Sequence, residues 1–313
     1  MKYIEFVNSL IKNQVSKQEK LVLFGQNINA GSCLGGLTRG LSVSESSKII
    51  NSTNSENSLC GFGFGMMMNG LSSIFFMKQL DFLLLGIDHL VNTYNIIRNT
   101  MQDTMASFTI MPIVVDNGYQ GPHSSLNNFP DFCSIARISG YTITNKLDAK
   151  KIIETQLISP GFRIICVSQR MFKNEVIEPQ GVLYSNNESS IFQYSDGKEV
   201  TIVCFNFSFP EGWNLMHELK KNGIESSLFN VNSTTDTNWN KIIENVKESK
   251  NLIIIDDSKS QNLVCDSLFS DIIQTCTLNK KIILKRQILD NWLNPVSDKM
   301  NIDYNEIIKQ LTN

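Results

Sequence analysis

Apolar and polar positions alternate with two different periods in the first part of the chain. The apolar residues of segment 3–15 recur at helical spacing, which predicts a helix, and the apolar run 21–24 predicts a buried strand. Segment 25–40 is punctuated by glycine, so we expect a loop that leads into a short helix. Residues 48–51 form a candidate short strand. Helix and strand patterns therefore follow one another from the start.

The next segments predict two helices of unusual composition. Residues 52–56 are a cluster of N-cap residues, and the helix expected after them is rich in glycine and methionine. Segment 80–98 predicts a long, very apolar helix, because its polar residues fall on one narrow stripe: Asp81, Asp88, Asn92 and Asn95. A helix this apolar is expected to be buried from several sides, in a core or at a subunit interface.

The remaining patterns continue the alternation on both sides of a polar stretch. Before this stretch they predict strands at 108–115, 132–138 and 163–167, and a helix at 147–158. After it they predict strands at 200–205, 226–231, 252–256 and 281–285, and helices at 213–222, 239–247, 261–275 and 304–311. Strands that alternate with helices indicate parallel sheets covered by helices.

We therefore predict an α/β protein with two doubly wound domains, each built on a mostly parallel sheet. The polar stretch 179–198 has little periodicity and is interpreted as a linker. The predicted domains are residues 1–178 and 199–313.

Composition narrows the possible partners and location. The 313 residues include 28 Lys and Arg against 30 Asp and Glu, a net charge of −2 without a block of like charges, so nucleic acid is not expected as a partner. No apolar run approaches the roughly 20 residues that span a bilayer, and the first residues resemble neither a secretory nor a transit segment. Seven scattered cysteines without a C-x-x-C pair suit a reducing compartment. Three histidines are too few for a His-rich metal site. These features predict a cytoplasmic protein without a membrane partner or a metal ligand set of its own.

Two short motifs have an ordinary explanation. The triplet Gly61, Gly63 and Gly65 lacks the preceding strand and the glycine spacing of a dinucleotide-binding loop, so we expect it to allow close helix packing. Asp256 and Asp257 end a predicted buried strand, where paired carboxylates could bind a cation or a sugar, although a solvated turn is the favoured interpretation.

Two further residues are candidates for chemistry. Glu56 is expected in the first helical turn, where the helix dipole favours a carboxylate in any protein. His123 lies in the turn-forming context Gly-Pro-His-Ser-Ser, and a loop histidine is more often solvated than catalytic, although loops carry much of the chemistry of enzymes. Spacing alone does not decide either case.

Several segments, read in order, resemble one family. They are Leu23-Phe24-Gly25-Gln26-Asn27-Ile28 with Thr38-Arg39-Gly40-Leu41, Asn54-Ser55-Glu56 with residues 61–65 and Gly70-Leu71, Asp81-Phe82 with Ile87-Asp88 and Asn92, His123-Ser124, Asp148-Ala149-Lys150, Val200-Thr201-Ile202-Val203 and Asn294-Pro295. Together they resemble the beta subunits of the first component of 2-oxo acid dehydrogenases, and more loosely the C-terminal half of transketolase. The resemblance implies a pyrimidine-binding domain followed by a transketolase C-terminal-like domain, and its order along almost the whole chain is its main support.

This resemblance assigns roles to three residues. The family uses thiamine diphosphate, whose weakly acidic thiazolium proton is removed with the help of its own aminopyrimidine ring. Glu56 corresponds to the glutamate that bonds the pyrimidine nitrogen and activates the cofactor. Phe82 corresponds to the aromatic residue that packs against the aminopyrimidine, and His123 to the histidine that meets the substrate. The resemblance thus implies Glu56 and His123 as catalytic residues, and Glu56 and Phe82 as cofactor-binding residues.

The diphosphate half of the cofactor site is missing from the sequence. Enzymes of this family hold the diphosphate through Mg²⁺ and a Gly-Asp-Gly run, which this chain does not contain. The resemblance therefore implies a companion subunit that carries Gly-Asp-Gly and Mg²⁺, in a hetero-oligomer of two plus two chains that acts on a small-molecule substrate.

Three departures from the family bear on the reaction. Gln26 stands where many relatives have an acidic residue, and the stretch between His123 and Phe132 is several residues short. The loop before Pro160 is also short, where dehydrogenase beta subunits often bind a monovalent cation. The shortened loops favour a transketolase-like transfer of a two-carbon unit from a ketose or 2-oxo acid, whereas Gln26 and the unusual loops together are what a non-catalytic homologue would predict. The alternatives are the beta subunit of an oxidative 2-oxo acid dehydrogenase and a non-catalytic scaffold or regulatory homologue.

Overall fold

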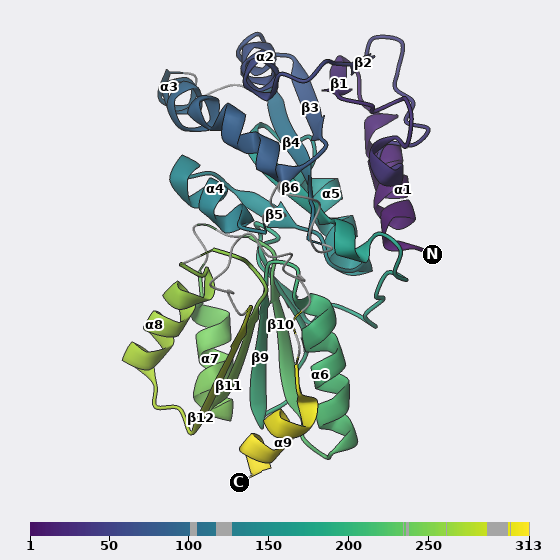
Figure 1. Ribbon diagram of the computed structural model, residues 1–313. Coiled ribbons are helices and arrows are strands. Elements are labelled where there is room, and N and C mark those ends of the chain that lie inside the picture. The colour runs from purple at the N-terminus through teal and green to yellow at the C-terminus, as the bar shows by residue number, and fades with distance from the viewer. Residues whose placement is uncertain are drawn as a thin grey trace, which may run out of the picture.

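The computed structural model describes residues 1–100, 105–116, 127–233, 235, 238–260, 262–286, 300 and 302–312 of the chain. Its strands form two six-stranded sheets, which lie one above the other in Figure 1, with helices on both sides of each. Within the described residues, no helix is both long and apolar enough to cross a membrane. All seven cysteines are free thiols. The predicted α/β fold with two doubly wound, mostly parallel sheets is confirmed.

The first sheet contains six parallel strands in the order β2-β1-β3-β4-β6-β5. The strands are β1 (Leu21–Gly25), β2 (Lys48–Asn51), β3 (Ser72–Met77), β4 (Ser107–Val114), β5 (Gly140–Thr142) and β6 (Gly161–Ser168). The helical elements are α1 (Tyr3–Val15), η1 (Leu34–Gly36), α2 (Glu56–Met68), η2 (Leu80–Gly86), η3 (His89–Thr93), α3 (Tyr94–Thr100), α4 (Phe129–Ala136), α5 (Lys146–Gln156) and η4 (Gln169–Met171). Helices α1 and α5 pack together on one side of the sheet, and α2 and α3 lie on the other (Figure 1).

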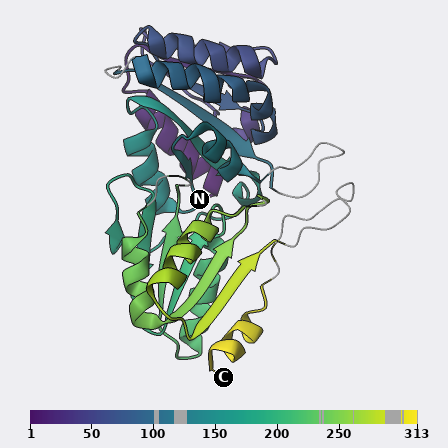
Figure 2. The ribbon, with the colours of Figure 1, turned by 90° about the vertical axis from the view of Figure 1, so that its left-hand side faces the viewer.

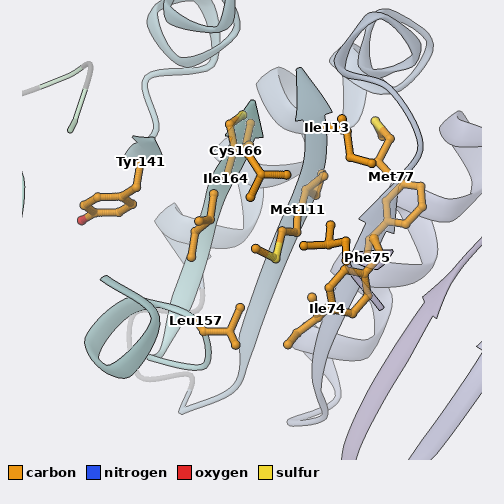
Figure 3. Packing of buried hydrophobic residues seen from close by; sticks show 14 of the residues in the cluster. Ile74, Phe75, Met77, Met111, Ile113, Tyr141, Leu157, Ile164 and Cys166 are labelled. Atoms are coloured by element: carbon orange, nitrogen blue, oxygen red, sulfur yellow. The ribbon is translucent and has the colours of Figure 1, made fainter. Parts of the chain in front are cut away.

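The core of this first unit is formed by the strands themselves. Burial of β-branched and aromatic residues on both faces of β3, β4 and β6 is what a parallel sheet between two helical layers requires. Figure 3 shows side chains from these strands packed with Leu157, which follows α5. Tyr141 of β5 belongs to the same buried cluster.

The second sheet has the order β12-β11-β9-β10-β8-β7, with β7 and β8 antiparallel to their neighbours. The strands are β7 (Tyr184–Ser185), β8 (Ile191–Ser195), β9 (Val200–Phe205), β10 (Ser226–Val231), β11 (Asn251–Asp256) and β12 (Lys280–Lys285), and the helices are α6 (Phe209–Lys221), α7 (Asn240–Ser249), α8 (Cys265–Thr275) and α9 (Tyr304–Thr312). Helices α6 and α9 cover one face and α7 and α8 the other, as Figures 1 and 2 show. Strands β7 and β8 lie within segment 179–198, for which the sequence pattern predicts a linker. We retain 1–178 and 199–313 as a proposed division into domains.

One predicted strand is wrong. The pattern at 132–138 predicts a strand, but α4 occupies most of this segment. Pro130 lies in the first turn of α4, where a missing N–H costs nothing, and Arg137 ends the helix in a left-handed conformation. The buried residues follow helical spacing: Phe129, Phe132, Cys133 and Ala136. The apolar residues are therefore the buried face of a short helix.

The apolar segment 80–98 is helical throughout most of its length, but it is not one helix. It is divided into the 3-10 helix η2, the π-helical turn η3 and α3. Gly86 ends η2 at a point where an added Cβ would come within 2.5 Å of the Cys60 sulfur in α2. Close approach to α2 therefore coincides with the change in helical geometry.

Candidate functional site

The strand order of the first sheet places a switch point at the carboxyl ends of β1 and β3. From β1 the chain passes to β2 on one side of the sheet and then to β3 on the other, so the strand order reverses between β1 and β3. Open α/β sheets bind ligands at such switch points. Gln26 follows β1, Glu56 follows β2 and Phe82 follows β3.

Glu56 is buried at the first turn of α2, with 7% of its surface exposed. The N-terminus of a helix stabilises a carboxylate there through its dipole and its free N–H groups. Burial, together with the charge of Glu56, raises the pKa of the Cys60 thiol to about 12. Cys60 is therefore an inert neighbour of Glu56.

Phe82 lies on η2, which packs directly against α2. The contact is close because Gly86 has no side chain: an added Cβ would lie 3.5 Å from the Glu56 carbonyl oxygen as well as close to Cys60. Gly61 makes a second close contact, with an added Cβ 3.1 Å from the His89 ring. The structure thus brings the elements that carry Glu56 and Phe82 together, with Phe82 half-buried.

His123 lies outside the described residues. The described chain stops at Asp116 after β4 and resumes at Asn127 before α4. Both of these flanking residues are completely buried.

Two polar groups near this switch point have no role assigned by the sequence. Gln26 is 8% exposed, and its side-chain amide nitrogen has no hydrogen-bond partner in the described structure. The Ser52 hydroxyl is likewise without a partner there, while the Ser52 amide donates to the Gly25 carbonyl at 2.9 Å and joins the two loops. Buried polar atoms without partners are rare in folded proteins and are expected where a ligand binds. A buried carboxylate, an aromatic ring and a free amide donor fit a flat heteroaromatic ligand with hydrogen-bonding edges, such as an aminopyrimidine.

The predicted glycine contacts are confirmed for part of the triplet. An added Cβ at Gly63 would lie 2.1 Å from the Phe108 ring, so α2 can approach β4 only with glycine at this position. Gly65 has no atom within 4 Å of such a Cβ and faces a hollow of about 560 Å³, which α2 forms with β1 and β2.

Asp256 and Asp257 do not form a solvated turn. Both are completely buried. Arg170 of η4 donates to the Asp257 carboxylate at 2.5 Å, so Asp257 is part of an ion pair between the two sheets. Among the described residues, no group of three or more His, Cys, Asp or Glu side chains is placed to hold a metal ion.

The carbonyl groups of the short loop before Pro160 accept hydrogen bonds from a cationic side chain. Arg163 of β6 is 5% exposed, and its guanidinium donates to the carbonyl oxygens of Gln156 at 3.0 Å, Ser159 at 2.5 Å and Pro160. Burial lowers the pKa of Arg163 to about 10, which still leaves it charged at neutral pH. These carbonyl groups are therefore bonded to the protein's own arginine.

No family model matches this chain. Curated proteins with similar sequences are beta subunits. The pyruvate dehydrogenase E1 component subunit beta of Mycoplasma genitalium is 22% identical over 261 residues, which cover 82% of this chain and 79% of that protein. The 2-oxoisovalerate dehydrogenase subunit beta of Bacillus subtilis is 19% identical and covers 91% of this chain and 88% of its own length. Over most of its length, this chain is similar to beta subunits of 2-oxo acid dehydrogenases.

The chain is also similar to an acetoin:2,6-dichlorophenolindophenol oxidoreductase subunit beta of Cupriavidus necator, with 18% identity over 86% of this chain and 82% of that protein. Solved structures show the same fold. A split-gene transketolase described as an inactive beta4 tetramer aligns with a TM-score of 0.63 and 11% identity, over 98% of this chain and 96% of that one. The transketolase of Campylobacter jejuni aligns with a TM-score of 0.66 and 10% identity, over 98% of this chain and 44% of that one. The fold is that of the transketolase-type α/β domains.

Proposed function

We propose that this chain is one subunit of a split thiamine diphosphate enzyme and carries the half-site for the cofactor's aminopyrimidine ring. The observation that carries this proposal is the Glu56 carboxylate, buried in the first turn of α2 against the segment that holds Phe82. The similarity to beta subunits of 2-oxo acid dehydrogenases and the transketolase-type fold support it.

Each residue has a defined task in this proposal. When bound, thiamine diphosphate supplies the thiazolium carbon that attacks a carbonyl substrate. Glu56 holds a proton on the pyrimidine nitrogen through a charge-assisted hydrogen bond, which is strong in a buried site. Phe82 stacks on the pyrimidine, and the Gln26 amide supplies a hydrogen-bond donor where many relatives have an acid. His123 meets the substrate as a hydrogen-bond donor or proton carrier.

A companion chain completes the enzyme. This chain contains no Gly-Asp-Gly run, so the diphosphate and its Mg²⁺ are assigned to a companion subunit. We propose an assembly of two copies of each chain in the cytoplasm, on the basis of the family resemblance and the seven free cysteines.

The proposed reaction is the transfer of a two-carbon unit from a ketose or 2-oxo acid. Arg163 supports a departure from the dehydrogenase type, since it bonds the carbonyl groups of the loop where the family resemblance places a monovalent cation. The sequence relatives favour the alternative, an oxidative 2-oxo acid dehydrogenase beta subunit. Assays of the assembled enzyme with a ketose and an aldose acceptor, and with a 2-oxo acid and an artificial electron acceptor, separate the two reactions. Turnover in neither assay would favour a scaffold or regulatory role.

Glu56→Gln tests the proposal directly. The substitution keeps the shape of the side chain but removes its charge, so we expect turnover of the assembled enzyme to fall by about 100-fold or more while assembly is unchanged. Glu5→Gln is a matched control, because Glu5 lies in the first turn of α1 with an exposed side chain. Steady-state kinetics and size-exclusion chromatography are the measurements. Turnover of Glu56→Gln within a few-fold of the unmodified enzyme would contradict the assignment.

A further inference from the structure

The loops that follow β1 and β2 are joined to each other beside the proposed half-site. In the sheet, Gly25 of β1 is paired with Asn51 of β2. One residue beyond this pair, the Ser52 amide donates to the Gly25 carbonyl at 2.9 Å. Gln26 follows Gly25 directly, and the loop after Ser52 leads to Glu56. The contact between the two strands therefore continues into the loops that carry two of the proposed cofactor-binding residues.

Asn51 makes a second connection through its side chain. Its carboxamide oxygen accepts from the backbone amides of Ile28 at 2.9 Å and Asn29 at 3.3 Å. Its carboxamide nitrogen donates to the side-chain oxygen of Asn29. Asparagine suits this arrangement because its short side chain carries both an acceptor and a donor that can reach a neighbouring backbone. Asn51 thus holds the chain just beyond Gln26.

Gln26 lies between two fixed points of the backbone. On one side, an added Cβ at Gly25 would come within 2.2 Å of the Phe76 carbonyl oxygen, so the chain before Gln26 lies close against β3. On the other side, Ile28 is buried and its amide is bonded to Asn51. The Gln26 amide nitrogen is itself without a hydrogen-bond partner in the described part of the chain. A buried donor that is fixed in this way is available to a ligand.

We propose that Asn51 is a positioning residue of the cofactor half-site. By holding the loop after β1 to the end of β2, it fixes the Gln26 amide relative to Glu56, so that both groups reach the same aminopyrimidine ring. A loop that is already fixed loses less conformational freedom when the ligand binds, which favours binding. This inference rests on the proposed function of Gln26 and Glu56. It adds a residue that acts on the cofactor only through Gln26.

The first test compares two substitutions of Asn51 in the assembled enzyme. Asn51→Ala removes the acceptor of both amides, and it takes nothing from the core because Asn51 is exposed. We expect the Kd of thiamine diphosphate to rise by about fivefold or more, since the Gln26 donor is then no longer held in place. Asn51→Asp keeps an acceptor for both amides, so its Kd should stay within about twofold of the unmodified enzyme. Calorimetric titration of the cofactor measures both, and an unrescued Kd in Asn51→Asp would contradict the assigned acceptor.

Asn186→Ala is the matched control. The Asn186 carboxamide oxygen also accepts from two consecutive backbone amides, those of Ser190 at 2.8 Å and Ile191 at 3.0 Å, but it does so between β7 and β8 of the second sheet. We expect Asn186→Ala to lower the melting temperature as Asn51→Ala does, while the Kd of the cofactor stays within about twofold. Equal increases of Kd in Asn186→Ala and Asn51→Ala would reflect a general loss of stability and would overturn the proposal.

A double variant shows whether Asn51 acts through Gln26. If it does, Asn51→Ala combined with Gln26→Ala will have the same Kd as Gln26→Ala alone, because the group that Asn51 positions is already absent. Increases of Kd that multiply would overturn the proposal, and so would an unchanged Kd in Asn51→Ala when Gln26→Ala is impaired. If Gln26→Ala itself binds the cofactor normally, the proposed contact of Gln26 with the cofactor is wrong, and the role of Asn51 fails with it.

Hydrogen exchange measures the connection itself, without cofactor or turnover. In the full chain, Asn51→Ala should increase exchange of the Ile28 and Asn29 amides, because these are the two donors that lose their acceptor. Asn51→Asp and Asn186→Ala should leave exchange at these two amides unchanged. Unchanged exchange at Ile28 and Asn29 in Asn51→Ala would overturn the role of Asn51 in holding this loop.

Discussion

Asp256 illustrates how burial sets the properties of single residues in this chain. It ends β11 with a completely buried side chain, and burial raises its pKa from an ordinary 3.8 to about 6. A hydrogen bond from the Ser258 amide at 3.0 Å opposes this shift. Because the unfolded chain has the lower pKa, the folded chain binds the proton more tightly. Protonation therefore stabilises the fold below about pH 4, and this stabilisation is lost as the pH rises through about 6.

Replacing Asp256 by Asn should accordingly stabilise the chain at neutral pH. Asparagine keeps the shape and one acceptor for Ser258 but carries no charge, so we expect a gain of about 1–2 kcal/mol in the free energy of unfolding at pH 7.5. The gain should shrink as the pH falls through about 6 and disappear below about pH 3, where the aspartate is protonated in both states. Asp271→Asn, at an exposed position of α8, is the control. Denaturant unfolding followed by circular dichroism at both pH values tests this, and a gain that does not depend on pH would contradict it.

Only part of the candidate site can be predicted at the residue scale. Glu56 is recognisable because N-cap residues precede it and the family resemblance covers it. Its burial depends on the packing of η2, which follows in the sequence only after α2 and β3. From the sequence, Gln26 is recognisable only as a glutamine at a position where many relatives have an acidic residue. Only the fold shows that its amide is buried without a partner among the described groups. Hydrogen-bond satisfaction is a property of the surroundings, which local sequence does not contain.

At the scale of elements, α2 depends on where its glycines lie. Gly63 faces β4, and a Cβ there would overlap the Phe108 ring at 2.1 Å, while Gly65 has open space around it. Both residues are in the interior of the same helix, where glycine is otherwise less favourable than alanine. The same residue type therefore serves packing at one position and weakens the helix at the other.

The pair Gly63→Ala and Gly65→Ala should have effects of opposite sign. Gly63→Ala must displace α2 or the Phe108 ring, so we expect a loss of about 1–3 kcal/mol in the free energy of unfolding. Gly65→Ala should gain about 0.5–1 kcal/mol, because alanine is the better helix former and meets no atom. Denaturant unfolding of the isolated chain measures both. A loss of stability for Gly65→Ala as large as that for Gly63→Ala would contradict the open space assigned to Gly65 and the close packing assigned to Gly63.

The elements that the sequence predicts well are those with one unambiguous period. Strands β9 and β10 have the predicted bounds because runs of apolar and β-branched residues end at polar turns. The run around Phe132 is too short to separate a strand from one face of a helix, and Pro130 at its start decides the outcome. In segment 80–98 the narrow polar stripe predicts one helix. The segment is divided where Gly86 contacts Cys60, and this tertiary contact is not visible in the local pattern.

At the scale of the whole molecule, the two sheets are joined by polar contacts that no local pattern predicts. Asp148 belongs to the capping box of α5 and also accepts hydrogen bonds from Asn230 of β10 at 3.1 Å and from Asn232, just after β10, at 2.9 Å. Thr142 donates to the Asn206 carbonyl at 2.8 Å. These partners are separated by more than sixty residues. The alternation of strand and helix patterns predicts two sheets, whereas the contact between them follows only from the complete fold.

Exposed apolar side chains gather on the elements that surround the proposed half-site. Phe62 on α2, Leu85 on η2 and Ile96 on α3 are each more than 60% exposed. Large exposed apolar groups on neighbouring elements, next to the apolar hollow along α2, indicate a surface that another chain covers. The predicted burial of segment 80–98 from several sides would then be completed in the assembly.

The isolated chain should therefore bind thiamine diphosphate weakly or not at all. The proposed half-site offers Glu56, Phe82 and Gln26, whereas the charged diphosphate and Mg²⁺, which dominate affinity for such a cofactor, are assigned to the companion chain because this sequence has no Gly-Asp-Gly run. A companion chain with Gly-Asp-Gly should create tight, Mg²⁺-dependent binding and raise the melting temperature, because a ligand held only by the native complex stabilises it by mass action. Leu85→Asp should prevent this gain by placing a charge in the covered surface, while Ile273→Asp, at an exposed position of α8, should not. Calorimetric titration of the cofactor into the chain alone, the mixture and both variants decides the matter. Tight Mg²⁺-dependent binding by the isolated chain would exclude a split cofactor site.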